Sequence, residues 1–127
     1  MRTPVTVLKN LTKMFPDFAA VWGSPDNCFL DDDGAFTYHG LFSEFSHYVR
    51  DNFALMEGQK KEELFHFIES CVSNDALHDE ELGNAVFTCF LENLAGGRLS
   101  PEYRRYMGSK SLQFFNQWDN SERQTAT

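Results

Sequence analysis

The chain has 127 residues, a net charge of −8 at pH 7 and a hydrophobic content of 42% that includes 13 phenylalanines. This length corresponds to one domain, and the apolar content supplies a buried core and excludes a disordered chain. The acidity argues against binding to nucleic acid or to an anionic membrane, because both need clustered lysine and arginine. It is compatible with a basic protein partner, although acidity also serves solubility alone.

The first predicted helix begins at Thr3 and Pro4, an N-cap residue followed by proline at the first helical position. Pro16 breaks this helix. Apolar residues continue on the same face as far as Trp22, so a kink or a second short helix follows. Residues 24–36 are then predicted to form a loop.

That loop carries three consecutive aspartates and a glycine within the stretch CFLDDDGAFTYHG, residues 28–40. The pattern resembles the first half of an EF-hand calcium loop. With Gly34 as the sixth residue, however, Phe29 and Gly40 occupy the first and twelfth positions, where a carboxylate and a bidentate glutamate are needed. The stretch therefore indicates an Asp-Gly turn, with Thr37 as the N-cap of the next helix.

Helical periodicity predicts three long helices after the loop, at about residues 38–56, 59–73 and 75–94. The last of these is apolar on nearly its whole circumference, which is typical of a helix at the centre of a bundle. Ser100 and Pro101 are predicted to be the N-cap and first residue of a short helix, and one more helix reaches about Trp118. Residues 120–127 are polar and are expected to form a disordered tail.

The predicted fold is all-α, a single compact bundle of about five to six antiparallel helices over residues 1–119. The three cysteines show no metal-binding spacing. Cys71 and Cys89 lie within apolar helical runs and are predicted to be buried and reduced. The sequence has neither the core of a signal peptide nor an apolar run of membrane-spanning length, so a cytosolic protein is expected.

Two Glu-x-x-His motifs, Glu44–His47 and Glu63–His66, lie on successive predicted helices, and Glu69 and Glu92 lie further along the chain. This is the ligand set of a ferritin-like dimetal bundle. At about 100° per residue, however, both motifs point away from the apolar faces of their helices. We therefore expect the motifs to face solvent, and we expect no metal ion and no other cofactor.

Glu69 and Glu92 each lie at the flank of an apolar helical face. We expect each carboxylate to bond to a helix N-terminus or to an arginine such as Arg104 or Arg105; a catalytic acid is the alternative. The serines lack a G-x-S-x-G setting, and Gly96-Gly97 lacks the lysine of a phosphate-binding loop. No active site is assembled, and the chain is predicted not to be an enzyme.

The segments LFHFIESCVSNDALHDEELGNAVFTCFLENL and YRRYMGSKSLQFFNQW, with DGAFTYHGLFSEFSHYV upstream, carry a resemblance that spans residues 34–118. The F-x-F-I-E helix, the break, the helix ending F-L-E-N-L and the closing Gly-Ser-Lys-Ser-Leu resemble small helical proteins of bacterial toxin–immunity loci. The resemblance implies a cytosolic immunity protein of a contact-dependent growth inhibition or similar system. Such a protein binds and blocks the toxic domain of its cognate effector without catalysis, and many of those toxins are nucleases with basic clefts.

An immunity protein of this kind would use its acidic surface, because complementary charge speeds association and helps to select the partner. The candidate partner-binding residues are Asp26, Asp31, Asp32 and Asp33, the neighbouring Phe36, Tyr38 and His39 as aromatic anchors, the pair Glu62 and Glu63, and Asp75, Asp79, Glu80 and Glu81. Alternatively, the acidic residues are helix caps and a solvated turn.

Two other classes of function stay open. One is a non-catalytic regulatory or adaptor domain that binds another protein, and the other is a dimetal enzyme. The free protein is expected to be a monomer, or a homodimer formed through an apolar helical face.

Overall fold

The computed structural model describes residues 2–31, 33–73 and 80–126, with side chains as far as Trp118. Its elements in chain order are α1 (Pro4–Met14), α2 (Pro16–Trp22), α3 (Tyr38–Asn52), the 3₁₀ turn η1 (Phe53–Leu55), α4 (Gly58–Val72), α5 (Glu80–Ala85), the π-helix η2 (Val86–Leu91), α6 (Glu92–Leu94), α7 (Ser100–Arg104) and α8 (Ser109–Ala126). All regular structure within these residues is helical, which confirms the predicted all-α class.

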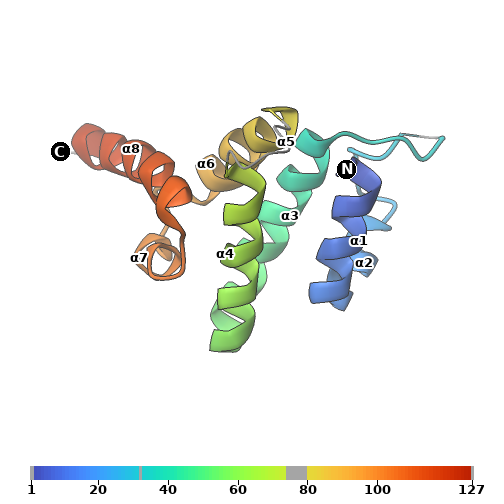
Figure 1. Ribbon diagram of the computed structural model, residues 1–127, viewed down its shortest axis with the longest axis horizontal. Coiled ribbons are helices and arrows are strands. Elements are labelled where there is room, and N and C mark those ends of the chain that lie inside the picture. The colour runs from blue at the N-terminus through green and yellow to red at the C-terminus, as the bar shows by residue number, and fades with distance from the viewer. Residues whose placement is uncertain (1, 32, 74–79, 127) are drawn as a thin grey trace.

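The helices form an antiparallel bundle. Figure 1 shows α3 and α4 running in opposite directions, with α1 and α2 on one side of them and α7 and α8 on the other. Residues 80–94 form one continuous, irregular helix (α5, η2 and α6) in which η2 contacts α3, α4 and α8. The prediction that this apolar helix is central is therefore confirmed.

The first two helices begin and end where the sequence indicates. Thr3 caps α1 in a capping box, because its hydroxyl accepts the N–H of Thr6 at 3.1 Å while the Thr6 hydroxyl accepts the N–H of Thr3 at 2.8 Å. Pro16 begins α2, so the predicted break produces a second short helix. That helix buries Phe18 and Trp22 in the core.

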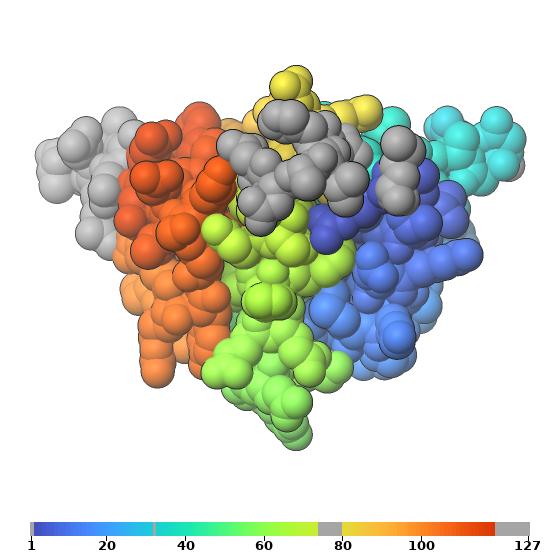
Figure 2. Space-filling model, in the orientation of Figure 1, coloured from blue at the N-terminus to red at the C-terminus, as the bar shows by residue number. Residues whose placement is uncertain are grey.

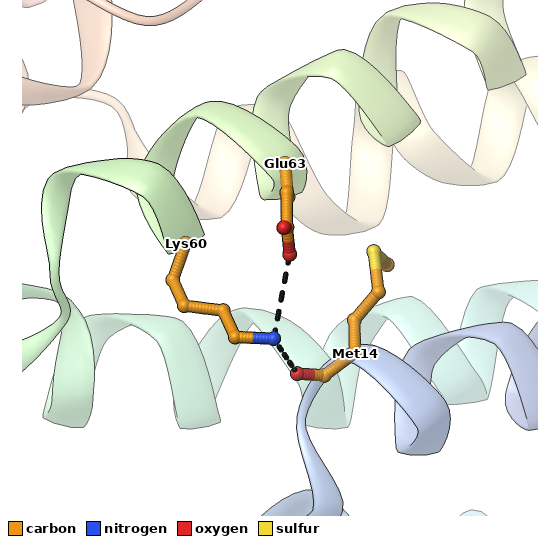
Figure 3. A network of polar contacts seen from close by, with 3 residues as sticks. All are labelled: Met14, Lys60 and Glu63. Carbon is orange, nitrogen blue, oxygen red and sulfur yellow. Dashed lines mark hydrogen bonds and ion pairs between the residues drawn. The ribbon is translucent and has the colours of Figure 1, made fainter.

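Lys60 joins the end of α1 to the beginning of α4 (Figure 3). Its ammonium group donates to the carbonyl of Met14 at 2.8 Å and lies 3.3 Å from the carboxylate of Glu63. It also lies 5.6 Å from the centre of the Phe15 ring. A cation is favourable at this point, because the last carbonyls of a helix carry a partial negative charge.

The core is built mainly from aromatic rings. The ring of Phe45 on α3 lies 5.0 Å from that of Phe18 on α2 and 5.5 Å from that of Phe90 on η2, measured between ring centres. All three side chains are fully buried. Each such pair contributes about 0.5–1.5 kcal/mol beyond the burial of its area. These contacts hold the N-terminal helices against the central helix.

The central helix departs from the regular α-helix that its periodicity predicted. Over Val86–Leu91 it is a π-helix, and the N–H of Glu92 bonds to the carbonyl of Phe87 five residues earlier. A π-turn widens the helix and changes the direction of the side chains that follow. Because apolar residues occupy almost every side of this segment, the wider turn leaves Val86, Phe90 and Leu91 in the core.

Two predictions at helix ends differ from the structure. Ser100 is not the N-cap of α7, since Leu99 holds that position and the buried Ser100 hydroxyl has no hydrogen-bond partner among the described residues. The helix α8 extends to Ala126, although a disordered tail was predicted from Asn120. Residues such as Glu122 favour helix, and extending a packed helix needs no new nucleation.

The carboxylate of Glu69 on α4 binds the N-terminus of α8, one of the partners that the sequence predicted for it. It accepts the backbone N–H groups of Lys110 and Ser111, both at 3.0 Å, and the Ser111 hydroxyl at 2.7 Å. A Cβ at Gly108 would lie 2.4 Å from the Glu69 carboxyl carbon, so only glycine permits this approach. For Glu92, which is half-buried on α6, the predicted partner stays a prediction.

The hydrogen bonds to Glu69 also determine its ionisation. Burial alone would raise the pKa of Glu69, but the three bonds from Ser111 and Lys110 outweigh it and lower this pKa from its ordinary value of 4.5. Because the pKa is lower in the folded state, the ionised carboxylate stabilises the fold above about pH 4.5, and this stabilisation is lost as the pH falls through the folded pKa.

We therefore expect Glu69→Gln to lower the free energy of unfolding by about 1–2 kcal/mol near neutral pH, because a helix N-terminus loses its charged cap. Urea unfolding measures the loss, which should shrink as the pH falls below 4.5. Glu62→Gln, at an exposed position of the same helix, is the control. Equal losses in the two variants would contradict this role of Glu69.

Candidate partner-binding site

The segment between α2 and α3, residues 23–37, projects from the bundle, and we call it the acidic loop. Figure 1 shows it extending beyond α1, and in Figure 2 its tip protrudes at the edge of the molecule. Asp26, Asp31 and Asp33 are exposed on it, while Asp32 lies outside the described residues. Three of the predicted partner-binding acids therefore lie on one protruding surface.

A buried asparagine fixes the base of the acidic loop. Asn27 is only 7% exposed. Its amide donates to the carbonyl of Trp22 at 2.7 Å, and its side-chain oxygen accepts the N–H of Phe29 at 3.0 Å. These bonds satisfy the last carbonyl of α2 and one N–H group of the loop. Asn27 therefore ties the first arm of the loop to the core.

Two apolar contacts hold the arms of the loop against the bundle. The ring of Phe36, on the second arm, packs edge-on against Trp22 with 4.9 Å between ring centres. Phe29, on the first arm, lies against the backbone of α3 at Gly40, where an added Cβ would be 2.8 Å from the Phe29 Cβ. Glycine at this position permits the close approach.

The tip of the loop is the Asp-Gly turn that the sequence predicted. The N–H of Gly34 donates to the carbonyl of Asp31 at 2.9 Å, and the N–H of Asp31 donates to the carbonyl of Ala35 at 2.9 Å. Gly34 has a φ of +86°, which favours glycine. The Asp33 carboxylate accepts the N–H of Ala35 at 3.0 Å. The acidic side chains are thus displayed on an ordered turn.

The aromatic residues beside the loop do not all reach the surface. Tyr38 was a candidate anchor only if exposed; it is 4% exposed, and its hydroxyl donates to the carbonyl of Arg2 at 2.9 Å, so that condition is not met. Phe36 is half-buried against Trp22. His39 is exposed, and its Nδ1 lies 3.2 Å from the sulfur of Cys89. Only Phe36 and His39 of these three are accessible to a partner.

Four further acidic candidates lie on α4 and α5. Glu62 is exposed on α4, and the neighbouring Glu63 is paired with Lys60 (Figure 3). Both belong to the first half of α4, which begins at the far end of the bundle from the loop (Figure 1). Glu80 and Glu81 are exposed in the first turn of α5. The other two predicted acids, Asp75 and Asp79, lie outside the described residues.

The Glu-x-x-His motifs do not converge. His47 on α3 and His66 on α4 are exposed, as helical geometry predicted, and Glu44 is half-buried. Over residues 2–31, 33–73 and 80–118, no three or more His, Cys, Asp or Glu side chains group closely enough to hold a metal ion.

Two hollows lie elsewhere on the surface. One of about 380 Å³ is lined by Arg50, Arg98 and Tyr103 among others, and another of about 320 Å³ by Glu62 and Arg105 among others. Burial raises the pKa of Tyr103, and Arg50 offsets part of that effect. Neither lining includes a serine or a cysteine.

Sequence reasoning missed the two residues that hold the base of the acidic loop. Asn27 carried a weak signal, since asparagine bonds to nearby backbone groups in turns. Gly40 carried a clearer one, because glycine inside a predicted helix is unfavourable by about 1 kcal/mol relative to alanine and often marks a close backbone approach.

These features define a small all-α protein whose exposed acidic loop is fixed at its base and ordered at its tip. Residues 8–124 match the family described as Domain of unknown function (DUF7674), and the chain belongs to this family. No curated protein and no solved structure matches it. None of the described helices combines the length and the apolar character needed to cross a membrane.

We expect Gly40→Ala to destabilise the protein by about 1–3 kcal/mol, because the new methyl group forces Phe29 and its arm of the loop to shift. Urea unfolding measures this change, and faster amide hydrogen exchange at Phe29 would report the loosened base. Gly58→Ala is the matched control, since a Cβ added there would meet no neighbouring atom within 4 Å. Equal stability of the two variants would contradict the role of Gly40.

Proposed function

We propose that this protein is a cytoplasmic immunity protein that binds and neutralises a cognate bacterial toxin domain through the acidic loop. The observation that carries the proposal is the protruding loop with Asp26, Asp31 and Asp33 exposed. The proposed partner is a toxin domain with a basic cleft, as in a nuclease. The proposed action is non-catalytic, because the acidic loop would occupy the cleft that the substrate of the toxin needs.

The geometry of the loop supports binding by insertion. Its base is held by Asn27 and by the contact between Phe36 and Trp22, and its tip is a hydrogen-bonded turn. A partner therefore need not order the loop, which lowers the entropic cost of association. Like charges at the tip lose their mutual repulsion when a basic surface neutralises them, so charge complementarity favours such a partner.

The sequence also suggested two alternative functions. A regulatory or adaptor domain would use the same acidic surface to bind a protein that is not a toxin. A dimetal enzyme would need the Glu-x-x-His motifs to converge, and the exposure of His47 and His66 argues against that arrangement. Metal analysis of the purified protein separates the dimetal alternative, since such an enzyme would carry two equivalents of metal.

The direct test is calorimetric titration of the protein with the toxin domain encoded beside its gene, at two salt concentrations. We expect nanomolar affinity that weakens in higher salt, as steered association between opposite charges does. The double variant Asp31→Asn with Asp33→Asn should bind about tenfold more weakly or worse. The turn should persist in this variant, because an asparagine at residue 33 keeps an oxygen for the N–H of Ala35.

The matched control is Asp51→Asn with Glu57→Gln, which removes the same charge from two exposed positions outside the acidic loop. If the control and the loop variant both bind more weakly than the wild-type protein and to the same extent, the loop is excluded as the contact. Only a general effect of net charge would then remain. Absence of binding by the wild-type protein would overturn the immunity proposal.

A further inference from the structure

Cys89 is not the buried cysteine that its apolar surroundings predicted. It is half-buried on the π-helix η2, and its sulfur lies 3.2 Å from Nδ1 of the exposed His39 on α3. The two residues are 50 positions apart in the sequence, so the contact is created by the fold. A thiol and an imidazole at hydrogen-bond distance form a pair in which the imidazole can take the thiol proton.

The surrounding structure fixes this pair. Asn93 donates from its side-chain amide to the carbonyl of Cys89 at 2.7 Å and to the hydroxyl of Ser46 on α3 at 3.2 Å. These bonds tie the backbone of the π-helix to the helix that carries His39. His39 is in the first turn of α3, so the pair joins the N-terminal end of α3 to η2.

The other two cysteines lie in less favourable surroundings. Cys71 is only 6% exposed, and burial raises its pKa to about 11, an effect that the nearby Arg2 only partly offsets. Cys28 is exposed on the acidic loop. Within the described part of the chain, only Cys89 has a hydrogen-bond contact with a histidine.

We propose that Cys89 is a reactive thiol that forms mixed disulfides with low-molecular-weight disulfides, with His39 as its base. Nδ1 of His39 takes the proton from Sγ of Cys89, and the thiolate attacks one sulfur of the disulfide. A new bond forms to Sγ while the original sulfur–sulfur bond breaks. The departing thiolate takes the proton back from His39, so no other oxidant or reductant is needed. This reaction is independent of toxin binding.

The test exposes the reduced wild-type protein to oxidised glutathione at pH 7 and follows each cysteine by peptide mass spectrometry. The imidazole of His39 is placed to take the proton of Cys89 as the thiol attacks, whereas Cys28 has no hydrogen-bond contact with a histidine among the described residues. We expect Cys89 to react about three- to tenfold faster than Cys28.

His39→Asn should reduce the rate at Cys89 to about that at Cys28 and leave the rate at Cys28 unchanged. His47→Asn removes another exposed histidine of α3 and serves as the control, with no expected change at either cysteine. Equal rates at Cys89 and Cys28 in the wild-type protein would overturn the proposal without any substitution. An unchanged rate at Cys89 in His39→Asn, with circular dichroism confirming the fold, would also overturn it.

Discussion

The packing of Phe45 between Phe18 and Phe90 is the contact on which the rest of the structure depends. Phe18 belongs to α2 and Phe45 to α3, and these two helices are the ends of the acidic loop. A close aromatic contact inside a fully buried core holds the two helices at one separation. The loop therefore begins and ends at fixed points. Because folding of the core already brings these two points together, it offsets most of the entropic cost of closing the loop.

The acidic tip works against the stability of the fold. Asp31 and Asp33 lie within one tight turn, and like charges at this spacing repel each other. No cation is paired with either carboxylate among the residues described, so the repulsion is balanced elsewhere, by the core and by the buried Asn27. Local charge repulsion that the rest of the molecule offsets is typical of functional surfaces. An exposed and unneutralised acidic tip agrees with the binding role proposed for the loop.

The sequence predicted those features that depend on neighbouring residues. Thr3 and Thr37 cap their helices as expected, because an N-cap needs only a short segment of chain. A helix N-terminus was one of the two partners predicted for Glu69, because a carboxylate at the edge of an apolar helical face needs a hydrogen-bond donor. The burial of Tyr38 and the π-turn of η2 depend on contacts between distant segments, which local periodicity does not contain.

The first turn of α3 contributes contacts both to the acidic loop and to the pair of Cys89 and His39. Successive side chains of a helix point about 100° apart, so Tyr38, His39 and Gly40 face three different parts of the molecule. Tyr38 bonds to the backbone of Arg2, His39 contacts Cys89, and Gly40 accommodates Phe29 at the base of the acidic loop. A small rotation of this turn would disturb all three contacts together. The bond of the buried Tyr38 to Arg2 therefore belongs to the same turn as the contact of His39 with Cys89 and the contact of Gly40 with Phe29.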